Sequence, residues 1–254
     1  YFYYPLPDYK MPQVIYSEKY LPKNGSLDNW IPYYSMNNNS MISDEKRLYN
    51  DISDNNVFEF FANSFLVECS IDNNKLGEVD YAVSSPFRKS EFDIITTHSY
   101  KNGFCKTATD KSISLLNTID SNHKALALRG LHTCKTNING NTLASETITG
   151  TSLTQLLIDA YKTRVTDNVY HILDKLYDEI KKSSDSSDTL NSIFNSTKEL
   201  TLDVLDKNDK LLANGFIDMI HKNCFVDKEG NYIWIDQEWC FNDIPASYVL
   251  FHNI

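Results

Sequence analysis

Residues Gly215–Trp239 read GFIDMIHKNCFVDKEGNYIWIDQEW. Two short apolar segments, Cys224–Val226 and Tyr232–Ile235, flank the turn sequence DKEGN. Glycine in such a turn supplies a positive φ, which is typical of hairpin connections. The sequence therefore predicts a β-hairpin that brings Asn223, just before its first strand, next to Asp236, at the end of its second.

Three polar side chains of this stretch have oxygen atoms suited to phosphate chemistry. Asp218 and Asn223 are five residues apart, and Asp236 follows thirteen residues after Asn223. Mg²⁺ prefers hard oxygen ligands and leaves several positions to phosphates and water, which suits one carboxylate and one amide oxygen. A second carboxylate can accept the proton of an attacking hydroxyl group. A solvated loop ahead of an ordinary β-hairpin is the alternative interpretation.

Composition limits the class of protein. The chain has 254 residues, 41% of them hydrophobic, and a formal net charge of −10. The length permits one large or two modest domains, and the charge argues against a general binder of nucleic acid or anionic membranes. Five scattered cysteines without a C-x-x-C pattern fit reduced thiols and a cytoplasmic location better than a disulfide or zinc framework.

No apolar run reaches 18 residues, and the first residues lack a basic segment followed by an apolar core. We therefore expect neither a transmembrane helix nor a signal peptide. The chain does not begin with Met and stops inside an apolar pattern, so we expect it to be an internal piece of a longer protein.

The first 70 or so residues contain FYYPLPDYKMP (2–12), IYSEKYLP (15–22) and FANSFLV (61–67). These stretches resemble the end of a class I S-adenosylmethionine-dependent methyltransferase, whose last two strands form an antiparallel edge. In that family the Gly-rich cofactor loop and the acidic ribose ligand lie upstream. The resemblance thus implies S-adenosylmethionine binding only outside this chain. An aromatic, Pro-rich packing segment is the alternative, and the polar segment 71–77 is the predicted boundary.

The remaining pattern predicts strands followed by helices. Apolar alternation and the Asn-Gly turns predict several strands, and apolar spacing of three and four residues predicts the helices. We expect strands over 58–69, 78–85, 91–99, 104–108, 125–127, 131–136 and 141–148. We expect helices over 110–120, 154–164 and 165–182, and one or two further helices within 190–212.

From about residue 78 onward the chain resembles protein-kinase-like small-molecule phosphotransferases of the aminoglycoside phosphotransferase and choline kinase type. The resemblance rests on Asp218-x-x-x-x-Asn223, on Ile235-Asp236 after an aromatic strand, and on the order of three strands, a helix and further strands. It implies an α+β, kinase-like two-lobe fold behind a methyltransferase-like segment. The implied limits are 1–75 for that segment, 76–254 for the kinase-like domain, about 78–148 for its antiparallel small lobe, and about 150–254 for its helical, C-terminally truncated large lobe.

The resemblance also implies ATP, Mg²⁺ and a set of site residues. These are the base Asp218, the metal ligands Asn223 and Asp236, and the nucleotide-binding residues Lys106, Ser85, Arg88, Glu146 and Ile148. Lys106 would hold the α- and β-phosphates, although a strand-edge lysine is the alternative. The turn 84–90 would contact phosphates, although a solvated turn is equally compatible. The backbone of 146–148 would contact the adenine, although a plain strand–helix connection is also compatible.

A methyltransferase end followed by a kinase-like domain resembles bifunctional methyltransferase–kinase enzymes of bacterial surface polysaccharide synthesis. It implies a phosphotransferase whose partners are a nucleotide and a small-molecule or glycan acceptor, and not a nucleic acid. The sequence departs from the protein-kinase pattern at three points, which leave alternatives to an active phosphotransferase open. Phe216 stands where many kinases have His, the helix over 110–120 has no Glu to pair with Lys106, and Glu238 replaces the Gly of D-F-G. The alternatives are a catalytically inactive kinase-fold scaffold, and activity that belongs only to the upstream methyltransferase.

Overall fold

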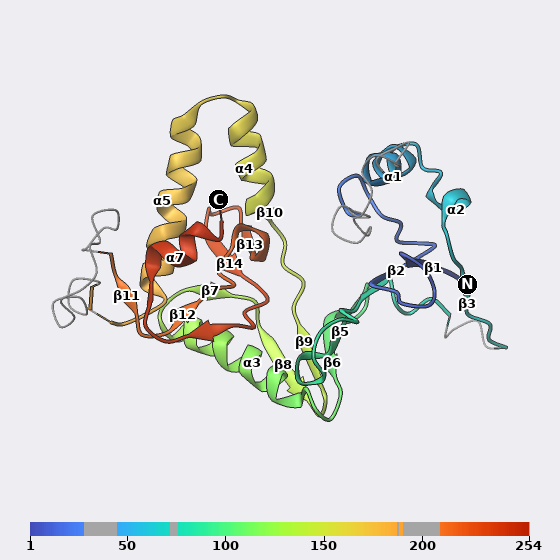
Figure 1. The fold of residues 1–254 in the computed structure, drawn as a ribbon, viewed down its shortest axis with the longest axis horizontal. Coiled ribbons are helices and arrows are strands. Elements are labelled where there is room, and N and C mark those ends of the chain that lie inside the picture. The colour runs from blue at the N-terminus through green and yellow to red at the C-terminus, as the bar shows by residue number, and fades with distance from the viewer. Residues whose placement is uncertain (28–44, 72–75, 187, 190–208, 254) are drawn as a thin grey trace. The chain divides into compact units, whose positions relative to one another are not determined.

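The computed structural model describes residues 1–27, 45–71, 76–186, 188–189 and 209–253. Within these ranges the protein has a mixed α+β fold with an eight-stranded sheet, three smaller sheets and several helices (Figure 1). The predicted α+β class is confirmed. Part of the predicted boundary at 71–77 and most of the predicted helical segment 190–212 lie outside the described residues.

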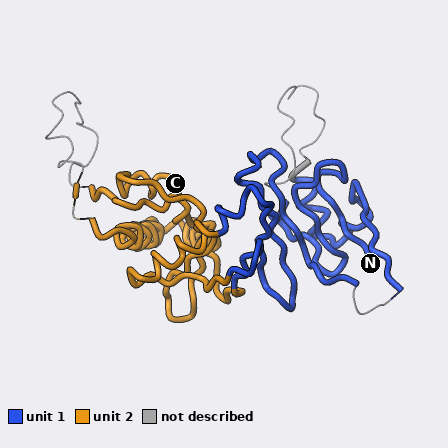
Figure 2. The backbone as a smooth tube through the Cα atoms, turned by 90° about the horizontal axis from the view of Figure 1, so that it is seen from below, with its two compact units in different colours: residues 1–116, 138–145 blue, residues 117–137, 146–254 orange. Residues whose placement is uncertain are grey.

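The chain folds into two compact units (Figure 2). Unit 1 comprises residues 1–116 and 138–145, and unit 2 comprises residues 117–137 and 146–254. The last passage of the chain between the units falls between Ser145 and Glu146. The predicted boundary near residue 75 lies inside unit 1, where strands from both sides of it pair. The division into methyltransferase-like and kinase-like segments stays a prediction.

Unit 1 is built on the eight-stranded sheet, whose order is β3-β1-β2-β4-β5-β6-β9-β8. The neighbouring strands from β3 to β9 pair antiparallel. The strands are β1 (Phe2–Leu6), β2 (Val14–Ser17), β3 (Leu66–Val67), β4 (Tyr81–Val83), β5 (Ile94–Ser99), β6 (Gly103–Ala108), β8 (Thr136–Asn139) and β9 (Thr142–Ser145). The helices of this part are α1 (Glu45–Asp54), α2 (Phe58–Phe61) and the 3₁₀ turn η3 (Ser90–Phe92).

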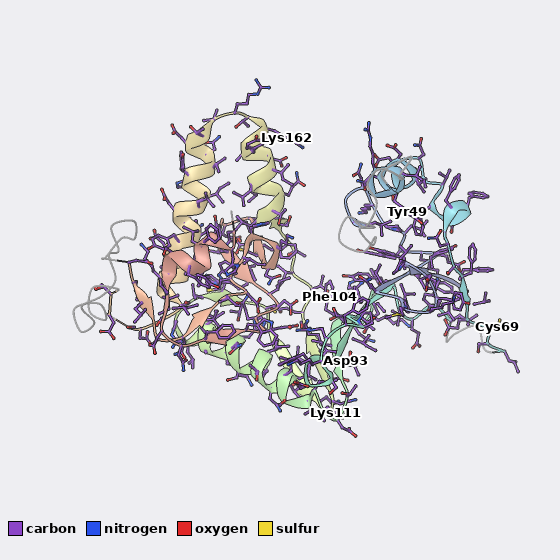
Figure 3. All side chains as sticks on the ribbon, viewed as in Figure 1. Tyr49, Cys69, Asp93, Phe104, Lys111 and Lys162 are labelled. Atoms are coloured by element: carbon purple, nitrogen blue, oxygen red, sulfur yellow. The ribbon has the colours of Figure 1, made fainter. Side chains whose placement is uncertain are left out.

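Aromatic side chains make the core of unit 1. Tyr4 of β1 and Tyr16 of β2 pack edge-on against Phe58, with ring centroids 5.8 and 6.5 Å apart. Tyr49 of α1 joins them and is buried (Figure 3). Such pairs add about 0.5–1.5 kcal/mol beyond burial of their area. The paired aromatic rings therefore anchor α1 and α2 on β1 and β2.

The predicted strand over 58–69 is wrong. Residues 58–61 form the helical turn α2, and only 66–67 form a strand. The turn buries Phe58 and brings the Glu59 carboxylate to the Tyr4 hydroxyl, which donates to it over 3.0 Å. The apolar run suggested a strand because its exposed members, Phe60 and Phe61, cannot be told from core residues in sequence.

The predicted strands near 81, 95 and 105 are confirmed as β4, β5 and β6. The helix that follows is longer than predicted: α3 spans Ile113–Leu128. The strand predicted over 125–127 is wrong because these residues continue α3. Leu126 is fully buried in the core of unit 2. Apolar residues spaced three to four apart along α3 lie on one face of the helix, so this face can pack against a core.

Unit 2 combines the remaining helices with a four-stranded sheet of order β10-β13-β14-β7. Two pairs of two-residue strands, β11 with β16 and β12 with β15, complete it. The strands are β7 (His132–Thr133), β10 (Thr151–Ser152), β11 (Leu211–Leu212), β12 (Gly215–Phe216), β13 (Cys224–Val226), β14 (Tyr232–Trp234), β15 (Cys240–Phe241) and β16 (Ile244–Pro245). The helices are α4 (Leu153–Lys162), α5 (Thr166–Lys182), the 3₁₀ turn η4 (His221–Asn223) and α7 (Ala246–Phe251).

Helices α4 and α5 cover the hairpin of β13 and β14 through a shared apolar core. Leu153, Leu176, Ile180 and Trp234 are fully buried in it. Helix α4 begins one residue before the predicted range of 154–164, because the Ser152 side chain accepts a hydrogen bond from the Gln155 N–H over 3.2 Å and caps its first turn. None of the helices in the described ranges is long and apolar enough to cross a membrane.

We expect Gly150→Ala to destabilise unit 2. A Cβ atom at Gly150 would lie 2.5 Å from the carbonyl oxygen of Val226, a backbone atom held in the pairing of β10 with β13. Overpacking of this kind costs roughly 1–3 kcal/mol. Urea denaturation followed by circular dichroism measures the loss.

The matched control is Gly230→Ala. Gly230 has the positive φ of +83° that the turn sequence predicts, but an added Cβ would meet no atom within 4 Å. Its cost is therefore limited to backbone strain of about 1–2 kcal/mol. A Gly150→Ala protein as stable as the unmodified protein would show that β10 and β13 approach less closely than described.

Candidate functional site

The hairpin of β13 and β14 forms as predicted. Cys224 pairs with Trp234 and Val226 with Tyr232, so Asn223 and Ile235 stand at the same end. The Ile235 N–H donates to the Asn223 carbonyl over 2.9 Å. The Asn223 side-chain Nδ2 reaches the Asp236 carbonyl at 3.5 Å. The prediction that the hairpin brings Asn223 and Asp236 together is confirmed.

Asp218 joins the same hydrogen-bonded network. Its carbonyl accepts from Nδ2 of Asn223 over 3.1 Å. Its Oδ2 accepts from the N–H groups of Glu238 and Trp239, over 2.8 and 2.7 Å. We call Asp218, Asn223 and Asp236 the Asp–Asn–Asp cluster. Backbone and side-chain bonds fix its members relative to one another, which is the geometric requirement for a positioned reaction.

Asp236 has an unusual backbone conformation, with φ = +55°. Few non-glycine residues adopt this left-handed region, and Asp and Asn do so most readily. The residue follows directly after β14 and Ile235, so the left-handed turn redirects the chain as it leaves the sheet. Strained conformations of this kind often occur at functional sites.

Burial raises the pKa of the Asp218 carboxyl to about 6. The N–H groups of Trp239 and Glu238 favour the charged form and oppose this shift, whereas the negative charges of Asp236 and Glu238 contribute to it. A carboxylate with this pKa is largely ionised at neutral pH and is still more basic than an ordinary aspartate. Such a pKa is suited to general-base catalysis.

Asn223 and Asp236 fit the ligand chemistry of Mg²⁺. The Asn223 amide nitrogen donates to main-chain carbonyls of Asp218 and Asp236, so its carbonyl oxygen is on the opposite side of the amide. In the described residues no group of three or more His, Cys, Asp or Glu side chains is arranged to hold a metal. One carboxylate and one amide oxygen are a sparse set, as is usual for Mg²⁺ bound together with substrate phosphates.

The predicted phosphate-binding residues lie in unit 1. Lys106 is on β6, between Thr96 of β5 and Leu143 of β9, and only 9% of it is exposed. Strand β6 is paired on both sides, so Lys106 is not on an edge strand of the sheet. Ser85 and Arg88 are in the turn after β4, which the Arg88 N–H closes by donating to the Ser85 carbonyl over 3.0 Å.

The predicted adenine-binding segment lies in unit 2, between β9 and β10. Glu146 pairs with Lys135 twice: its N–H donates to the Lys135 carbonyl over 3.1 Å, and its carboxylate accepts from the Lys135 N–H over 3.0 Å. The N–H of Glu146 is therefore occupied, and contacts of its carbonyl and of Ile148 with a nucleotide stay a prediction.

His221 of η4 extends the site toward α4. Its Nδ1 lies 2.8 Å from the hydroxyl of Thr154, and the backbone N–H of His221 donates a hydrogen bond to Oδ1 of Asn253. Burial lowers its pKa, and Lys222 lowers it further. His221, Thr154 and Asn253 line a pocket of about 670 Å³ together with Leu157, Ile158, Tyr161, Lys162, Val169 and Leu173.

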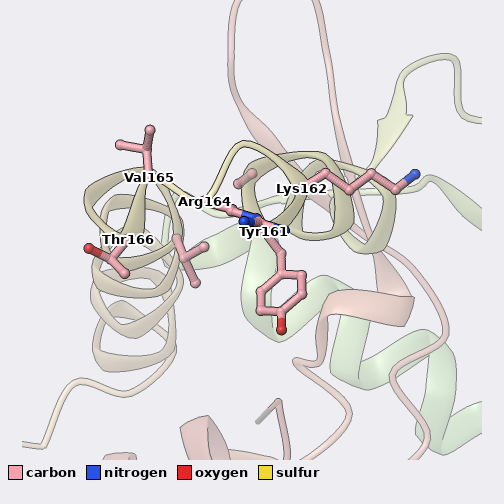
Figure 4. Close-up of a pocket in the computed structure, with 7 residues that line it drawn as sticks. Tyr161, Lys162, Arg164, Val165 and Thr166 are labelled. Atoms are coloured by element: carbon pink, nitrogen blue, oxygen red, sulfur yellow. The ribbon is translucent and has the colours of Figure 1, made fainter.

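A second pocket, of about 640 Å³, lies at the turn between α4 and α5 (Figure 4). Tyr161, Lys162, Arg164, Val165 and Thr166 line it. Its lining includes neither His221 nor a member of the Asp–Asn–Asp cluster, whereas the 670 Å³ pocket includes His221 of the predicted catalytic loop.

Sequence reasoning missed the contribution of α3 to the site. Asn122 donates to the Gln237 carbonyl over 3.0 Å, and the His123 Nε2 lies 3.5 Å from the Gln237 N–H. Because the helix was predicted to end at residue 120, these two residues were not assigned to it. The one feature of the sequence that could have indicated a role for Gln237 in the site is its position directly after Asp236.

No model of a known protein family matches the chain, and a search of curated proteins finds no significant relative.

We expect the contribution of Asp218 to the stability of the metal-free protein to fall as pH rises from about 4 to 6. The folded pKa of Asp218, about 6, lies above the ordinary value of 3.8, so the folded state binds more protons than the unfolded state in this window. One pKa unit corresponds to about 1.4 kcal/mol, and partial exposure reduces the effect, so we expect a loss on the order of 2 kcal/mol.

Urea denaturation at several pH values, compared with Asp218→Asn, isolates this contribution. The difference in unfolding free energy between the two proteins should change across the window in favour of the variant at higher pH. A difference that is constant between pH 4 and 6.5 would contradict the raised pKa.

Proposed function

We propose that the protein is an ATP- and Mg²⁺-dependent phosphotransferase that acts on a hydroxyl group of a sugar or glycan. The observation that carries the proposal is the Asp–Asn–Asp cluster at the end of the β13–β14 hairpin, where hydrogen bonds tie Asp218, Asn223 and Asp236 together. Phosphoryl transfer needs positioning and charge neutralisation more than covalent chemistry, and this cluster offers both.

In the proposed reaction Asp218 is the base. The acceptor oxygen forms a bond to the γ-phosphorus of ATP, the bond from that phosphorus to the β–γ bridging oxygen breaks, and ADP leaves. Asp218 takes the hydroxyl proton. Its Oδ2 is held by two N–H groups, so the carboxylate keeps its orientation, and its pKa of about 6 supports this role.

Asn223 and Asp236 would hold Mg²⁺, which neutralises negative charge on the phosphate oxygens when bound. Lys106 would bind the α- and β-phosphates, with Ser85 and Arg88 as further phosphate contacts and Glu146 and Ile148 as adenine contacts. The burial of Lys106 on an interior strand supports a specific role, because lysines are rarely buried in proteins without one.

The order of elements supports a kinase-like two-lobe fold for residues 76–254. Three antiparallel strands, β4, β5 and β6, precede α3, and β8 and β9 follow it in the same sheet. The helices α4 and α5 and the cluster come later in the chain, as a helical large lobe requires. The antiparallel pairing of β1 with β2 and β3 supports a methyltransferase end in residues 1–75.

The acceptor would bind in the 670 Å³ pocket beside His221. Thr154, Lys162 and Asn253 offer polar contacts, and the exposed ring of Tyr161 offers a face for stacking. Together with a methyltransferase acting through S-adenosylmethionine upstream, the activity would belong to a cytoplasmic bifunctional enzyme of surface polysaccharide synthesis.

The direct test is transfer of label from [γ-³²P]ATP to oligosaccharides with terminal mannose, galactose or glucose, in Mg²⁺ and in EDTA. We expect Mg²⁺-dependent labelling of one acceptor class with matching ADP release. Bound nucleotide without ADP release for any acceptor would contradict catalysis and favour an inactive binding module.

A further inference from the structure

The buried side chain of Gln237 connects Asp218 to Ile235, the residue before Asp236. It is fully buried, and its Nε2 donates to the carbonyl of Asp218 over 3.0 Å and to the carbonyl of Ile235 over 2.8 Å. One bond holds the segment that carries Asp218, and the other holds the residue before Asp236. A single amide thus links the predicted catalytic loop to the residue that precedes the predicted metal ligand.

Helix α3 holds the backbone of Gln237. The side chain of Asn122 donates to the Gln237 carbonyl over 3.0 Å, and the Gln237 N–H points to Nε2 of His123 at 3.5 Å. Asn122 is 8% exposed and His123 is 2% exposed. In a medium without competing water these bonds restrict the backbone directly after Asp236.

Gln237 is an unfavourable choice for stability alone. Its Oε1 is buried and accepts no hydrogen bond from any residue in the described part of the chain. An unsatisfied buried acceptor costs free energy that an apolar side chain of similar length, such as methionine, would not cost. The two donated bonds offset this cost, and the amide is explained by what these bonds hold in place.

We propose that Gln237, held by Asn122, is a positioning residue that keeps Asp236 in its left-handed conformation and at a fixed place relative to Asp218. The inference rests on the proposed function. A residue at φ = +55° is stable only where its surroundings restrain it, and the bonds of Gln237 restrain both neighbours of Asp236.

The test compares Gln237→Met and Asn122→Asp with the unmodified protein. Methionine removes both donated bonds at nearly constant size, and aspartate places an acceptor against the Gln237 carbonyl. Electron paramagnetic resonance titration with Mn²⁺ in the presence of ATP measures metal affinity, and urea denaturation measures stability. Gln155→Met is the control, because Gln155 is an exposed glutamine on α4.

We expect Gln237→Met and Asn122→Asp to weaken Mn²⁺ binding at least about tenfold. Losses of this size are typical when a residue that positions a metal ligand is substituted. Gln237→Met should raise KM for Mn²⁺·ATP more than it lowers kcat, with a urea midpoint close to that of the unmodified protein. Gln155→Met should change none of these quantities.

Unchanged Mn²⁺ affinity in both folded variants, with Asp236→Asn losing it, would overturn the inference and leave the proposed function standing. A loss of affinity that only follows a loss of folded protein in urea would also overturn it. Absence of Mn²⁺ and ATP binding in the unmodified protein would overturn the proposed function and the inference together.

Discussion

Asp236→Asn should abolish Mg²⁺-dependent nucleotide binding and lower turnover about 10³-fold, the range seen when one preorganised electrostatic partner is removed. Asparagine has nearly the same size as aspartate and tolerates the left-handed φ of +55° equally well. The substitution therefore removes the negative charge while the fold is kept. Isothermal titration with Mg·ATP and the rate of ADP release measure the two effects.

Asp243→Asn is the matched control. Asp243 also has a left-handed backbone, with φ = +57°, and is exposed in the turn between β15 and β16. Asp243→Asn makes the same chemical change as Asp236→Asn, at a residue with nearly the same backbone conformation. Asp243 is not part of the cluster, however. Equal losses in the two variants would show that charge at position 236 has no special part in metal binding.

Asp218→Asn should lower kcat by about 10²–10⁴ and leave the affinity for Mg·ATP nearly unchanged. The amide oxygen can still accept from the N–H groups of Glu238 and Trp239, so the loop should keep its conformation. What it loses is the ability to take the proton of the acceptor hydroxyl. Steady-state kinetics separates the two quantities.

Asp178→Asn provides the comparison for this variant. Asp178 forms a surface ion pair with Lys181 on α5, and such pairs contribute little. It should change neither kcat nor KM. If Asp218→Asn instead weakened nucleotide binding and turnover to the same degree, Asp218 would be a structural or metal-binding residue rather than the base.

The local parts of the site could be predicted from the sequence. The turn around Gly230 and the apolar segments on each side are enough to predict the hairpin. Asn223 and Asp236 could therefore be placed together. The start of α4 could also be predicted, because Ser152 is a typical N-cap residue. In each case neighbouring residues determine the structure.

The remaining parts depend on contacts between distant residues. Asn122 and Gln237 are 115 residues apart, and the residues around each of them do not indicate the hydrogen bond between them. The helical turn at Phe58 likewise forms because Tyr4 and Tyr16 accept that ring in their core. The strand predicted over 125–127 failed because a short apolar run does not reveal whether it ends a helix or begins a strand.

The proposed function requires the Asp–Asn–Asp cluster to bind a nucleotide through Mg²⁺. Thermal unfolding of the 254-residue chain with Mg·ATP, and with ATP in EDTA, tests it most directly. At a hundredfold excess over Kd we expect a stabilisation of about 2.7 kcal/mol that requires Mg²⁺, persists in Asp243→Asn and is absent in Asp236→Asn. A folded protein that shows no shift at millimolar nucleotide, or the same shift in EDTA, would contradict the claim.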